Sequence, residues 1–209
     1  MQERIKYPRT PHLPYSETIG KDDKRLLDDS QFKNMYVVIT EKMDGENTTV
    51  YNDGYHARSL DSKHRDYHSW LLSYIPTWQY MLENGERVCG EYLYAEHSIH
   101  YNNLKNYFLG FSFWKNNICY GWKDTIAKFN ELGIVSVPVL YEGYYDPAIT
   151  IATAKAVITR GGEGVVIRNI NSFPLQNFAR NVAKYVRPNH VQTDEHWSQQ
   201  VIKRNELFS

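Results

Sequence analysis

The chain has 209 residues, and its 24 lysine and arginine residues equal its 24 aspartate and glutamate residues in number. Such a length suits one sizeable domain, and the balanced charge excludes a global positive field that would attract nucleic acid non-specifically. With 17 tyrosine and 5 tryptophan residues, the composition indicates a packed globular body and excludes a disordered chain.

The sequence lacks signals for disulfides, for secretion and for a membrane. Its two cysteines, Cys89 and Cys119, lie far apart, and neither belongs to a paired metal-ligand spacing. No apolar run reaches the roughly 20 residues of a membrane span, and the start MQERIKYPRT lacks the apolar core of a secretory signal. We therefore expect a cytoplasmic protein without a membrane partner.

The first 35 residues are polar and punctuated by proline, which predicts an extended N-terminal arm packed on the domain that follows. Residues 36–209 are expected to form that domain, without a separate C-terminal OB or RNA-binding domain. From Tyr36, β-rich runs alternate with Asp-Gly turn signals, which predicts an antiparallel meander of the strands YVVITEK, NTTVY and YHARS. Lys42 is therefore expected at a strand end beside a tight turn.

Helices and further strands are predicted in the rest of the chain. Ser62 is expected to cap a helix through HRDYHSWLLSYI that ends at Pro76, and TWQYMLEN is expected to form a short second helix. WKDTIAKFNELG predicts a helix closed by Gly133, and ITIATAKAVITR predicts a helix despite its β-branched residues. The other predicted strands are RVCGEYLYA, YFLGFSFW, VPVLYEG, GEGVVIRN and NVAKYVR. Antiparallel strands with helices at their edges indicate an α+β fold.

The most informative segment is ITEKMDGENTTVY, in which Lys42 has Glu41 and Asp44 beside it and Asn47 after it. A lysine nucleophile must lose its proton, and with an ordinary pKa near 10.4 only about one lysine in 2,500 is neutral at pH 7. A bound metal ion or a second cation reduces this deficit of roughly 4 to 5 kcal/mol. Taken alone, the short motif fits a surface hairpin with a solvated lysine equally well.

Charged residues follow Lys42 in a set order. Arg58 lies in HARS, Glu91 in GEYLY, Glu163 in GGEGVVIR and Lys184 in VAKYVR. Carboxylates are costly to bury beside a lysine and an arginine unless a divalent cation or a polyphosphate lies among them. Convergence of these side chains with Lys42 would therefore indicate a site for Mg²⁺ and a nucleotide.

In these motifs the chain resembles the covalent nucleotidyltransferases, and among them the ATP-dependent RNA ligases. EKMDGEN is similar to motif I of that family, so Lys42 is expected to attack the α-phosphate of ATP. The resemblance runs from about residue 36 to residue 187, and five ordered elements are specific where each alone is not. It implies an ATP-grasp-like ligase core, which is a nucleotidyltransferase domain of antiparallel sheets with flanking helices.

The resemblance also implies roles for the later motifs. GEYLY is similar to motif III, which gives Glu91 a contact with ribose or metal-bound water, and EGVVIR is similar to motif IV, which places Glu163 on metal-bound water. AKYVR is similar to motif V, which directs Lys184 to the α-phosphate. Many relatives have a second lysine two positions later, where this chain has Val186 followed by Arg187.

Further contacts with the nucleotide and the metal follow from the same resemblance. Glu41 is expected to contact adenine, Arg58 the phosphate or ribose, and Phe111 is preferred to Phe113 for stacking on adenine. The implied catalytic residues are Lys42, Asp44, Glu91, Glu163 and Lys184. The implied cofactor-binding residues are Glu41, Lys42, Asn47, Arg58, Glu91, Phe111 and Lys184. The implied metal residues, acting through water on Mg²⁺ or on Mn²⁺ in its place, are Asp44, Glu91 and Glu163.

The implied activity is that of an ATP-dependent RNA ligase, which adenylylates an RNA 5′-phosphate and joins it to an RNA 3′-hydroxyl. RNA with these ends is the expected partner, and a partner protein could supply further RNA-binding surface. Two alternatives stay open: another covalent nucleotidyltransferase, such as a DNA ligase core or a capping guanylyltransferase, and a non-catalytic nucleic-acid-binding relative. The motifs fit a nicked duplex, a tRNA break and single strands equally.

Two pairs of residues outside the motifs have simpler interpretations. His64 and His68 lie four apart on a predicted helix, and without a third ligand we interpret them as surface residues. Arg9 and His12 in RTPHLP could contact a triphosphate or RNA. An arm ordered by proline and packed on the domain is the favoured interpretation of that segment.

Overall fold

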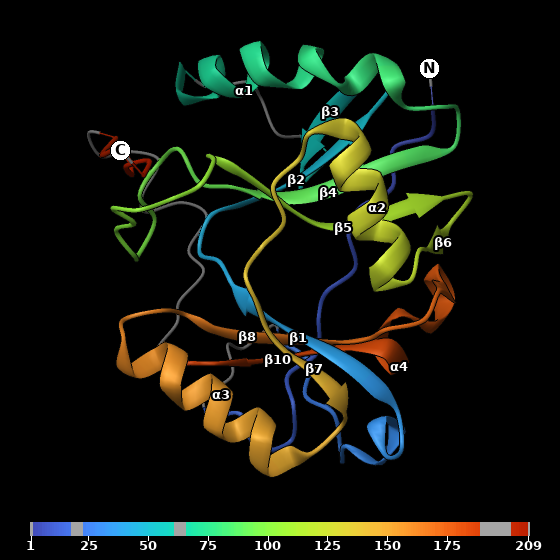
Figure 1. Ribbon diagram of the computed structural model, residues 1–209, viewed down its shortest axis with the longest axis vertical. Coiled ribbons are helices and arrows are strands. Elements are labelled where there is room, and N and C mark those ends of the chain that lie inside the picture. Colours follow the sequence, from blue (N-terminus) through green and yellow to red (C-terminus); the bar gives the residue numbers. More distant parts are fainter. Residues whose placement is uncertain (1, 18–22, 61–65, 189–201, 209) are drawn as a thin grey trace. The chain divides into compact units, whose positions relative to one another are not determined.

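A computed structural model describes residues 2–17, 23–60, 66–188 and 202–208 of the chain (Figure 1). The chain divides into two compact units, of which the first contains residues 1–7, 44–136 and 194–209 and the second contains residues 8–43 and 137–193. Each unit contains antiparallel strand pairs with helices against them, so the predicted α+β class is confirmed. Among the described residues, no helix has the length and apolar character needed to cross a membrane.

The second unit contains a four-stranded sheet with the strand order β10-β8-β1-β7. Its strands are β1 (Tyr36–Lys42), β7 (Val139–Tyr144), β8 (Gly164–Asn169) and β10 (Val182–Val186). All neighbouring strands are antiparallel, and Lys42 lies opposite Gly164 while Lys184 lies opposite Val166. This register places the end of β1 next to the beginning of β8, where Glu163 is located.

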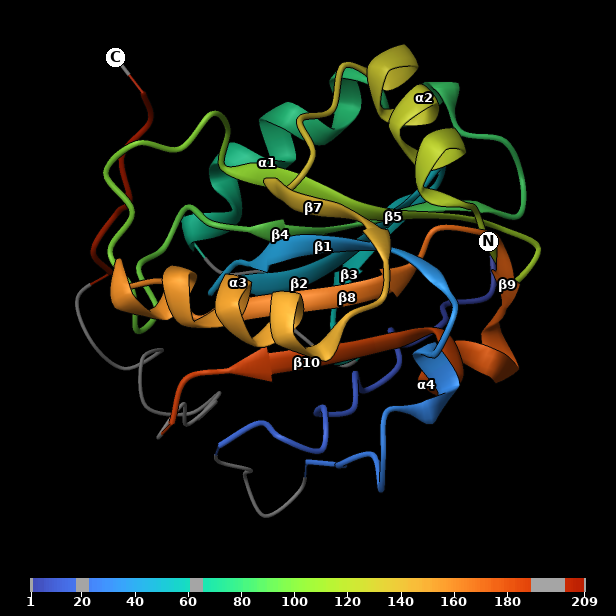
Figure 2. The same cartoon turned by 60° about the horizontal axis from the view of Figure 1, so that its bottom comes forward.

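Helix α3 (Pro147–Thr159) packs against β8 and β10, as Figure 2 shows. Asp146 caps its first turn by accepting hydrogen bonds from two backbone amides, and Pro147 occupies a position where no amide donor is needed. These start signals outweigh the β-branched residues that lower helix propensity, and the predicted helix is confirmed. Ala154 and Val157 of α3 belong to a fully buried core. The other core residues are Leu13, Phe32, Val37, Ile39, Val165, Ile167, Ala183 and Tyr185.

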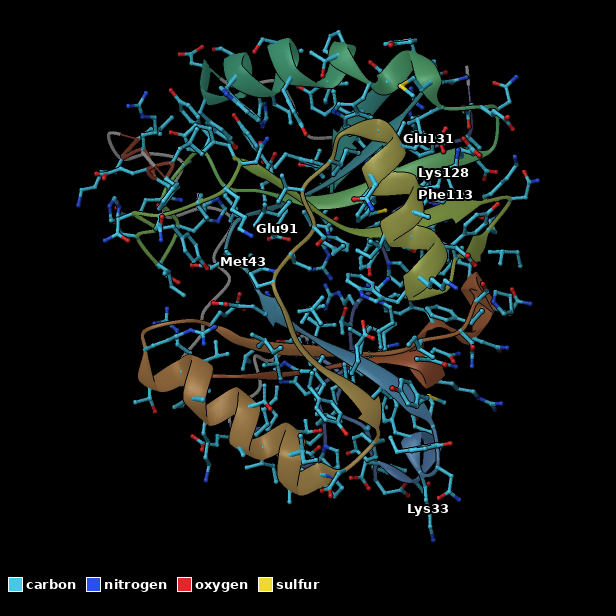
Figure 3. All side chains as sticks on the ribbon, in the orientation of Figure 1. Lys33, Met43, Glu91, Phe113, Lys128 and Glu131 are labelled. Carbon is cyan, nitrogen blue, oxygen red and sulfur yellow. The ribbon has the colours of Figure 1, made fainter. Side chains whose placement is uncertain are left out.

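In the first unit, five strands follow one another in the order β3-β2-β4-β5-β6. They are β2 (Glu46–Tyr51), β3 (Gly54–Ala57), β4 (Glu86–Tyr92), β5 (Phe108–Lys115) and β6 (Ile118–Cys119). Helix α2 (Trp122–Leu132) lies against β5 and ends at Gly133, as predicted. Lys128 of α2 lies 5.7 Å from the ring centre of Phe113, and Figure 3 labels both side chains.

The helical segment after residue 65 is shorter than predicted. Helix α1 (Ser69–Tyr74) stands between the 3-10 turns η2 (Asp66–His68) and η3 (Ile75–Thr77), and the expected second helix is one 3-10 turn, η4 (Gln79–Met81). Pro76 lies in η3 and lacks the amide that would continue α1. Ser62, the predicted cap, lies outside the described residues. The remaining elements are η1 (Ser30–Phe32), β9 (Phe173–Pro174), η5 (Leu175–Asn177) and α4 (Phe178–Asn181).

The predicted three-strand meander is wrong at its first turn. β2 and β3 form the expected antiparallel hairpin, but β1 pairs with β7 and β8 in the other sheet. Residues 43–45 form no hairpin turn, because the chain passes from the second unit to the first after Met43. The apolar run at residues 37–39 of β1 is fully buried, which is typical of a central strand with a neighbour on each side.

Part of the N-terminal arm extends the sheet of the second unit beyond β10. The amide of Leu13 donates to the carbonyl of Lys184 at 2.8 Å, and the amide of Lys184 donates to the carbonyl of Pro11 at 2.9 Å. On its other side, His12 exchanges backbone hydrogen bonds with residues 24–26. The backbone around Lys184 is therefore held by β8 on one side and by the arm on the other.

Among the glycines at the sheet of the second unit, Gly164 leaves the least space for a side chain. Its φ is 150°, and a Cβ at this position would collide with the carbonyl oxygen of Tyr185 in β10. Gly164→Ala should therefore lower the free energy of unfolding by at least about 1 kcal/mol, as measured by urea unfolding. Gly161→Ala is the matched control, because Gly161 has a φ of 91° but an added Cβ meets nothing within 4 Å. Equal losses in both variants would contradict the steric explanation.

Candidate active site

Lys42 ends β1 and forms an ion pair with Glu163, the residue that directly precedes β8. The Lys42 Nζ donates a hydrogen bond of 2.7 Å to Oε2 of Glu163 and lies 2.7 Å from Oε1. The Glu163 side chain is completely buried, whereas 16% of the Lys42 side chain is exposed. The backbone of Glu163 is held by the amide of Arg187, which donates to its carbonyl at 2.9 Å. A buried carboxylate requires a close cation, and Lys42 supplies it.

A second lysine, Lys184 in β10, lies near this ion pair. Lys184 is buried, and its Nζ lies 3.4 Å from Oδ1 of Asp23. Burial lowers the pKa of Lys184 and the positive charge of Lys42 lowers it further, although Asp23 and Glu163 oppose the shift. Repulsion between two ammonium groups favours the loss of one proton from the pair, which is what a lysine nucleophile requires.

His12 connects the arm to Lys184 through Asp23. Its Nε2 lies 3.0 Å from Oδ2 of Asp23 and its Nδ1 lies 3.0 Å from the hydroxyl of Ser16. Burial lowers the pKa of His12, and the charge of Lys184 adds to this shift. Burial raises the pKa of Asp23, but the charge of Lys184 and the hydrogen bond with His12 outweigh it and lower the pKa overall. His12 is therefore a buried neutral partner of the aspartate that faces Lys184.

The buried His12 predicts that stability rises with pH. Its folded-state pKa lies below the ordinary 6.5, so the unfolded chain binds more protons between the two values. The free energy of unfolding should therefore fall as the pH falls below 6.5 and through the folded pKa. His12→Gln should reduce this dependence, as measured by urea unfolding at about pH 5.5 and 7.5. His56, whose pKa is also lowered by burial, stays in both proteins and contributes to the dependence that remains. An unchanged pH dependence in the variant would contradict this prediction.

Glu41, the predicted adenine contact, forms an ion pair at the end of α3. Its Oε2 lies 2.5 Å from Nη2 of Arg160, and its backbone amide donates to the carbonyl of Pro138 at 2.9 Å. Glu41 is mostly buried, but Arg160 is more than half exposed. Exposed ion pairs contribute only about 0 to 1 kcal/mol, so Arg160 can release Glu41 to another hydrogen-bond donor at little cost.

Asp44 is the first residue of its segment in the first unit, and the loop after β4 holds it. Its Oδ2 accepts a hydrogen bond of 2.8 Å from the amide of Ser98 and one of 2.6 Å from the Ser98 hydroxyl. Its own amide donates to the hydroxyl of Tyr101 at 2.9 Å. Asp44 is buried; the two bonds from Ser98 hold its carboxylate, and the bond to Tyr101 holds its backbone.

Glu91 in β4 lies directly opposite Asn47 in β2, so the two side chains share one face of the sheet. Oε1 of Glu91 accepts a hydrogen bond of 3.1 Å from the amide of Gly45. A Cβ on Gly45 would come within 2.5 Å of the Tyr92 carbonyl oxygen, so only glycine allows this approach. Oδ1 of Asn47 is buried and has no hydrogen-bond partner among the described residues. Such an acceptor costs about 1 to 3 kcal/mol, and a hydroxyl donor such as that of a ribose would satisfy it.

The two stacking candidates in β5 differ in their surroundings. The register between β4 and β5 shifts by one residue, which leaves Phe111 without a partner in β4. Phe111 is partly exposed, and its ring lies edge-on to that of Tyr7 with the centroids 5.2 Å apart. Phe113 is fully buried and packs against Tyr120. Of the two rings, only Phe111 has surface for a ligand.

The other predicted positions differ in what they can contact. Arg58 directly follows β3, is partly exposed and forms no hydrogen bond or ion pair within the described part of the chain. Val186 is buried, whereas Arg187 beside it is partly exposed. A second cation at the end of β10 can therefore come from Arg187, since Val186 carries no charge.

The surface placement predicted for His68 is wrong. His68 is buried, its Nε2 lies 2.9 Å from Oε1 of Glu46, and the other oxygen of Glu46 accepts a hydrogen bond of 2.9 Å from the hydroxyl of Tyr67. Glu46 in β2 thus provides the partner that lets a polar ring enter the core. His64 lies outside the described residues.

Several residues of this site were missed in the sequence. Asp23 faces Lys184, Arg160 pairs with Glu41, and Ser98 and Tyr101 hold Asp44. None of them has a distinctive spacing to its partner, because each contact joins segments that are far apart in the chain. Only the paired strands and loops bring them together.

The donor atoms of the site suit a hard divalent cation. In the first unit, Asp44 and Glu91 carry carboxylate oxygens of the kind that Mg²⁺ prefers, and in the second unit Glu163 carries another such carboxylate. In the described ranges, no three His, Cys, Asp or Glu side chains are grouped as a metal centre. Mg²⁺ commonly keeps several waters, so one or two carboxylates are enough to hold it.

Several solved structures with a similar fold are RNA or DNA ligases. An archaeal ATP-dependent RNA ligase is 16% identical with a TM-score of 0.61, and the match covers 87% of this chain and 48% of that one. A putative ATP-dependent DNA ligase from Aquifex aeolicus is 16% identical with a TM-score of 0.57, covering 87% and 49%. A mutant Naegleria gruberi RNA ligase with ATP and Mn is 16% identical with a TM-score of 0.56, covering 88% and 61%. The fold is therefore that of a ligase nucleotidyltransferase domain, and this chain spans about half to three-fifths of those proteins.

The sequence also matches a family profile directly. The profile of the RNA ligase family matches residues 35–186, which is most of the chain. The chain therefore belongs to the RNA ligase family. A search of curated proteins found no match.

Proposed function

We propose that this chain is an ATP-dependent RNA ligase that uses Lys42 as its nucleophile. Three reactions follow one another. In the first, the Lys42 Nζ forms a bond to the α-phosphorus of ATP and pyrophosphate leaves. In the second, an RNA 5′-phosphate oxygen takes the AMP and the lysine is released. In the third, an RNA 3′-hydroxyl attacks the activated phosphate and AMP leaves. The observation that carries this proposal is the position of the Lys42 amine, which lies 2.7 Å from the fully buried carboxylate of Glu163. Its positive charge also lowers the pKa of the nearby Lys184.

Residues of the second unit would prepare the amine for attack. Glu163 holds Nζ in place and can receive its proton, since its carboxylate already accepts the hydrogen bond from Nζ. Lys184 stabilises the negative charge that develops on the α-phosphate, and its hydrogen bond to Asp23 limits the positions of its ammonium group. Glu41 can accept from the amino group of adenine after Arg160 moves away.

Residues of the first unit would bind the nucleotide and the cation. Asp44 and Glu91, with Glu163 of the second unit, are the residues that would hold a hydrated Mg²⁺ or Mn²⁺, and the cation would supply positive charge on the phosphates. The unmatched Oδ1 of Asn47 accepts from a ribose hydroxyl. Arg58 contacts phosphate or ribose, and Phe111 stacks on adenine.

The substrate in this proposal is RNA with a 5′-phosphate and a 3′-hydroxyl, and a partner protein could enlarge the RNA-binding surface. The balanced charge of the chain supports local rather than general attraction of RNA. Cys89 and Cys119 are both buried and free, which supports a reducing compartment such as the cytoplasm.

Labelled nucleotides and defined RNA ends test the proposal. The protein is incubated with Mg²⁺ and α-labelled ATP or GTP, and the adenylylated protein is then offered nicked RNA, nicked DNA and single-stranded RNA. We expect label on the protein from ATP only, followed by sealing of an RNA substrate. Labelling from GTP would indicate a capping enzyme, sealing of DNA alone would indicate a DNA ligase core, and no labelling would overturn the proposal.

A further inference from the structure

Asn205 is fully buried in the first unit and holds the loop of residues 93–107 that follows β4. Its Oδ1 accepts a hydrogen bond of 2.8 Å from the amide of Tyr101. Its Nδ2 donates to the carbonyls of Leu93 at 2.8 Å and Ala95 at 3.3 Å. One amide side chain therefore connects both ends of a nine-residue stretch of the loop, residues 93–101.

The backbone around Asn205 is bound to the same loop. Its amide donates to the carbonyl of Tyr94 at 3.0 Å, and its carbonyl accepts from the hydroxyl of Tyr107 at 3.0 Å. The next amide, that of Glu206, donates to the carbonyl of Tyr101 at 2.7 Å. Figure 1 shows residues 202–208, in red, beside this yellow-green loop. Every polar group of Asn205 thus has a partner, and all of these partners lie in the loop.

The loop depends on these bonds because it has little regular structure of its own. Residues 93–107 contain no helix and no named strand, so their backbone groups must find partners elsewhere. The same loop carries Ser98 and Tyr101, which make the three hydrogen bonds to Asp44 described above. Tyr101 thus links Asn205 to Asp44. Its amide donates to the side chain of Asn205, and its hydroxyl accepts a hydrogen bond from the amide of Asp44.

We propose that Asn205 is a positioning residue for the ligase reaction, which holds Asp44 in its working orientation through Ser98 and Tyr101. This inference rests on the proposed function, since it gives the orientation of Asp44 a role in nucleotide transfer. Partners that orient a metal-binding side chain typically change metal affinity or activity by about 10- to 100-fold when they are removed.

Three variants of the full chain test the inference. Asn205→Ala removes all three side-chain bonds, Asn205→Asp keeps the acceptor for Tyr101 but loses the two donors, and Tyr101→Phe removes only the hydroxyl that contacts Asp44. Glu206→Ala is the matched control, because it keeps the backbone bonds of Glu206 and removes only a largely exposed side chain, whose Oε1 lies 3.8 Å from Nε2 of His100. Asn205→Asp and Tyr101→Phe keep the test valid if Asn205→Ala does not fold.

The first measurement is hydrogen exchange of the loop amides without nucleotide or metal. Asn205→Ala and Asn205→Asp should speed exchange at Ser98 by at least about tenfold over wild type and Glu206→Ala. The second is the rate of Lys42 adenylylation as Mg²⁺ is varied. The Asn205 variants and Tyr101→Phe should each need about tenfold more Mg²⁺ for the half-maximal rate. A general loss of folded protein would lower the maximal rate without moving this midpoint.

Wild-type behaviour separates the two proposals. If wild type takes no label from ATP, the proposed function fails. If wild type is labelled but the folded variants show unchanged exchange at Ser98 and an unchanged Mg²⁺ midpoint, only the role of Asn205 is overturned.

Discussion

Lys42→Ala and Lys42→Arg should both lose adenylylation of the protein, by a factor of about 10⁴ or more. Each variant removes the amine that forms the phosphorus–nitrogen bond, and the later steps of the reaction cannot begin without that bond. Lys42→Arg keeps a positive charge beside Glu163, whereas Lys42→Ala leaves that buried carboxylate without its cation. We therefore expect a lower Tm for Lys42→Ala than for Lys42→Arg, although both are inactive.

The measurement is transfer of label from ATP to the protein, with thermal unfolding of each variant as a control for folding. Lys155→Arg in α3 is the matched substitution, because Lys155 is exposed and forms no part of the site. This control should be labelled as well as wild type. If folded Lys42→Arg were labelled at the wild-type rate, another side chain would have to be the nucleophile.

Glu163→Gln should slow adenylylation by about 100-fold while the protein stays folded. Glutamine keeps the size of the side chain and one acceptor oxygen, but it removes the charge that holds Nζ at 2.7 Å and the base that can take its proton. The loss should therefore lie mainly in the maximal rate rather than in the KM for ATP.

Single-turnover labelling at several ATP concentrations separates these two constants. Glu142→Gln is the matched control, since Glu142 is exposed on β7 and is remote in sequence from the motifs. It should retain the wild-type rate and KM. A wild-type rate in folded Glu163→Gln would show that the buried carboxylate serves the fold alone.

The parts of the structure that could be predicted are those encoded by neighbouring residues. The end of β1 at Lys42 and the helix that Gly133 ends follow from local spacing and from turn or capping chemistry. The antiparallel hairpin of β2 and β3 follows from its Asn-Asp-Gly turn in the same way. The motif resemblance favours Phe111 over Phe113 for stacking on adenine, and the Phe111 ring is partly exposed in the structure.

The parts that could not be predicted depend on pairing between distant segments. The sequence near β1 does not indicate that its neighbours are β7 and β8 rather than β2, because the apolar pattern of a buried strand does not specify which strands pair with it. Burial of His68 depends on Glu46, 22 residues away in the chain, and the contact of Asp23 with Lys184 spans 161 residues. Asn205 likewise follows the loop it holds by about a hundred residues.

Locating the AMP on the protein tests the central claim most directly. Wild-type protein is incubated with ATP and Mg²⁺ without RNA, digested, and analysed by mass spectrometry for the peptide that carries AMP and for the modified residue. We predict a single phosphoramidate on the Nζ of Lys42, which disappears when pyrophosphate or a 5′-phosphorylated RNA is added. AMP attached to Lys184 or to any other residue, with Lys42 unmodified, would contradict the account.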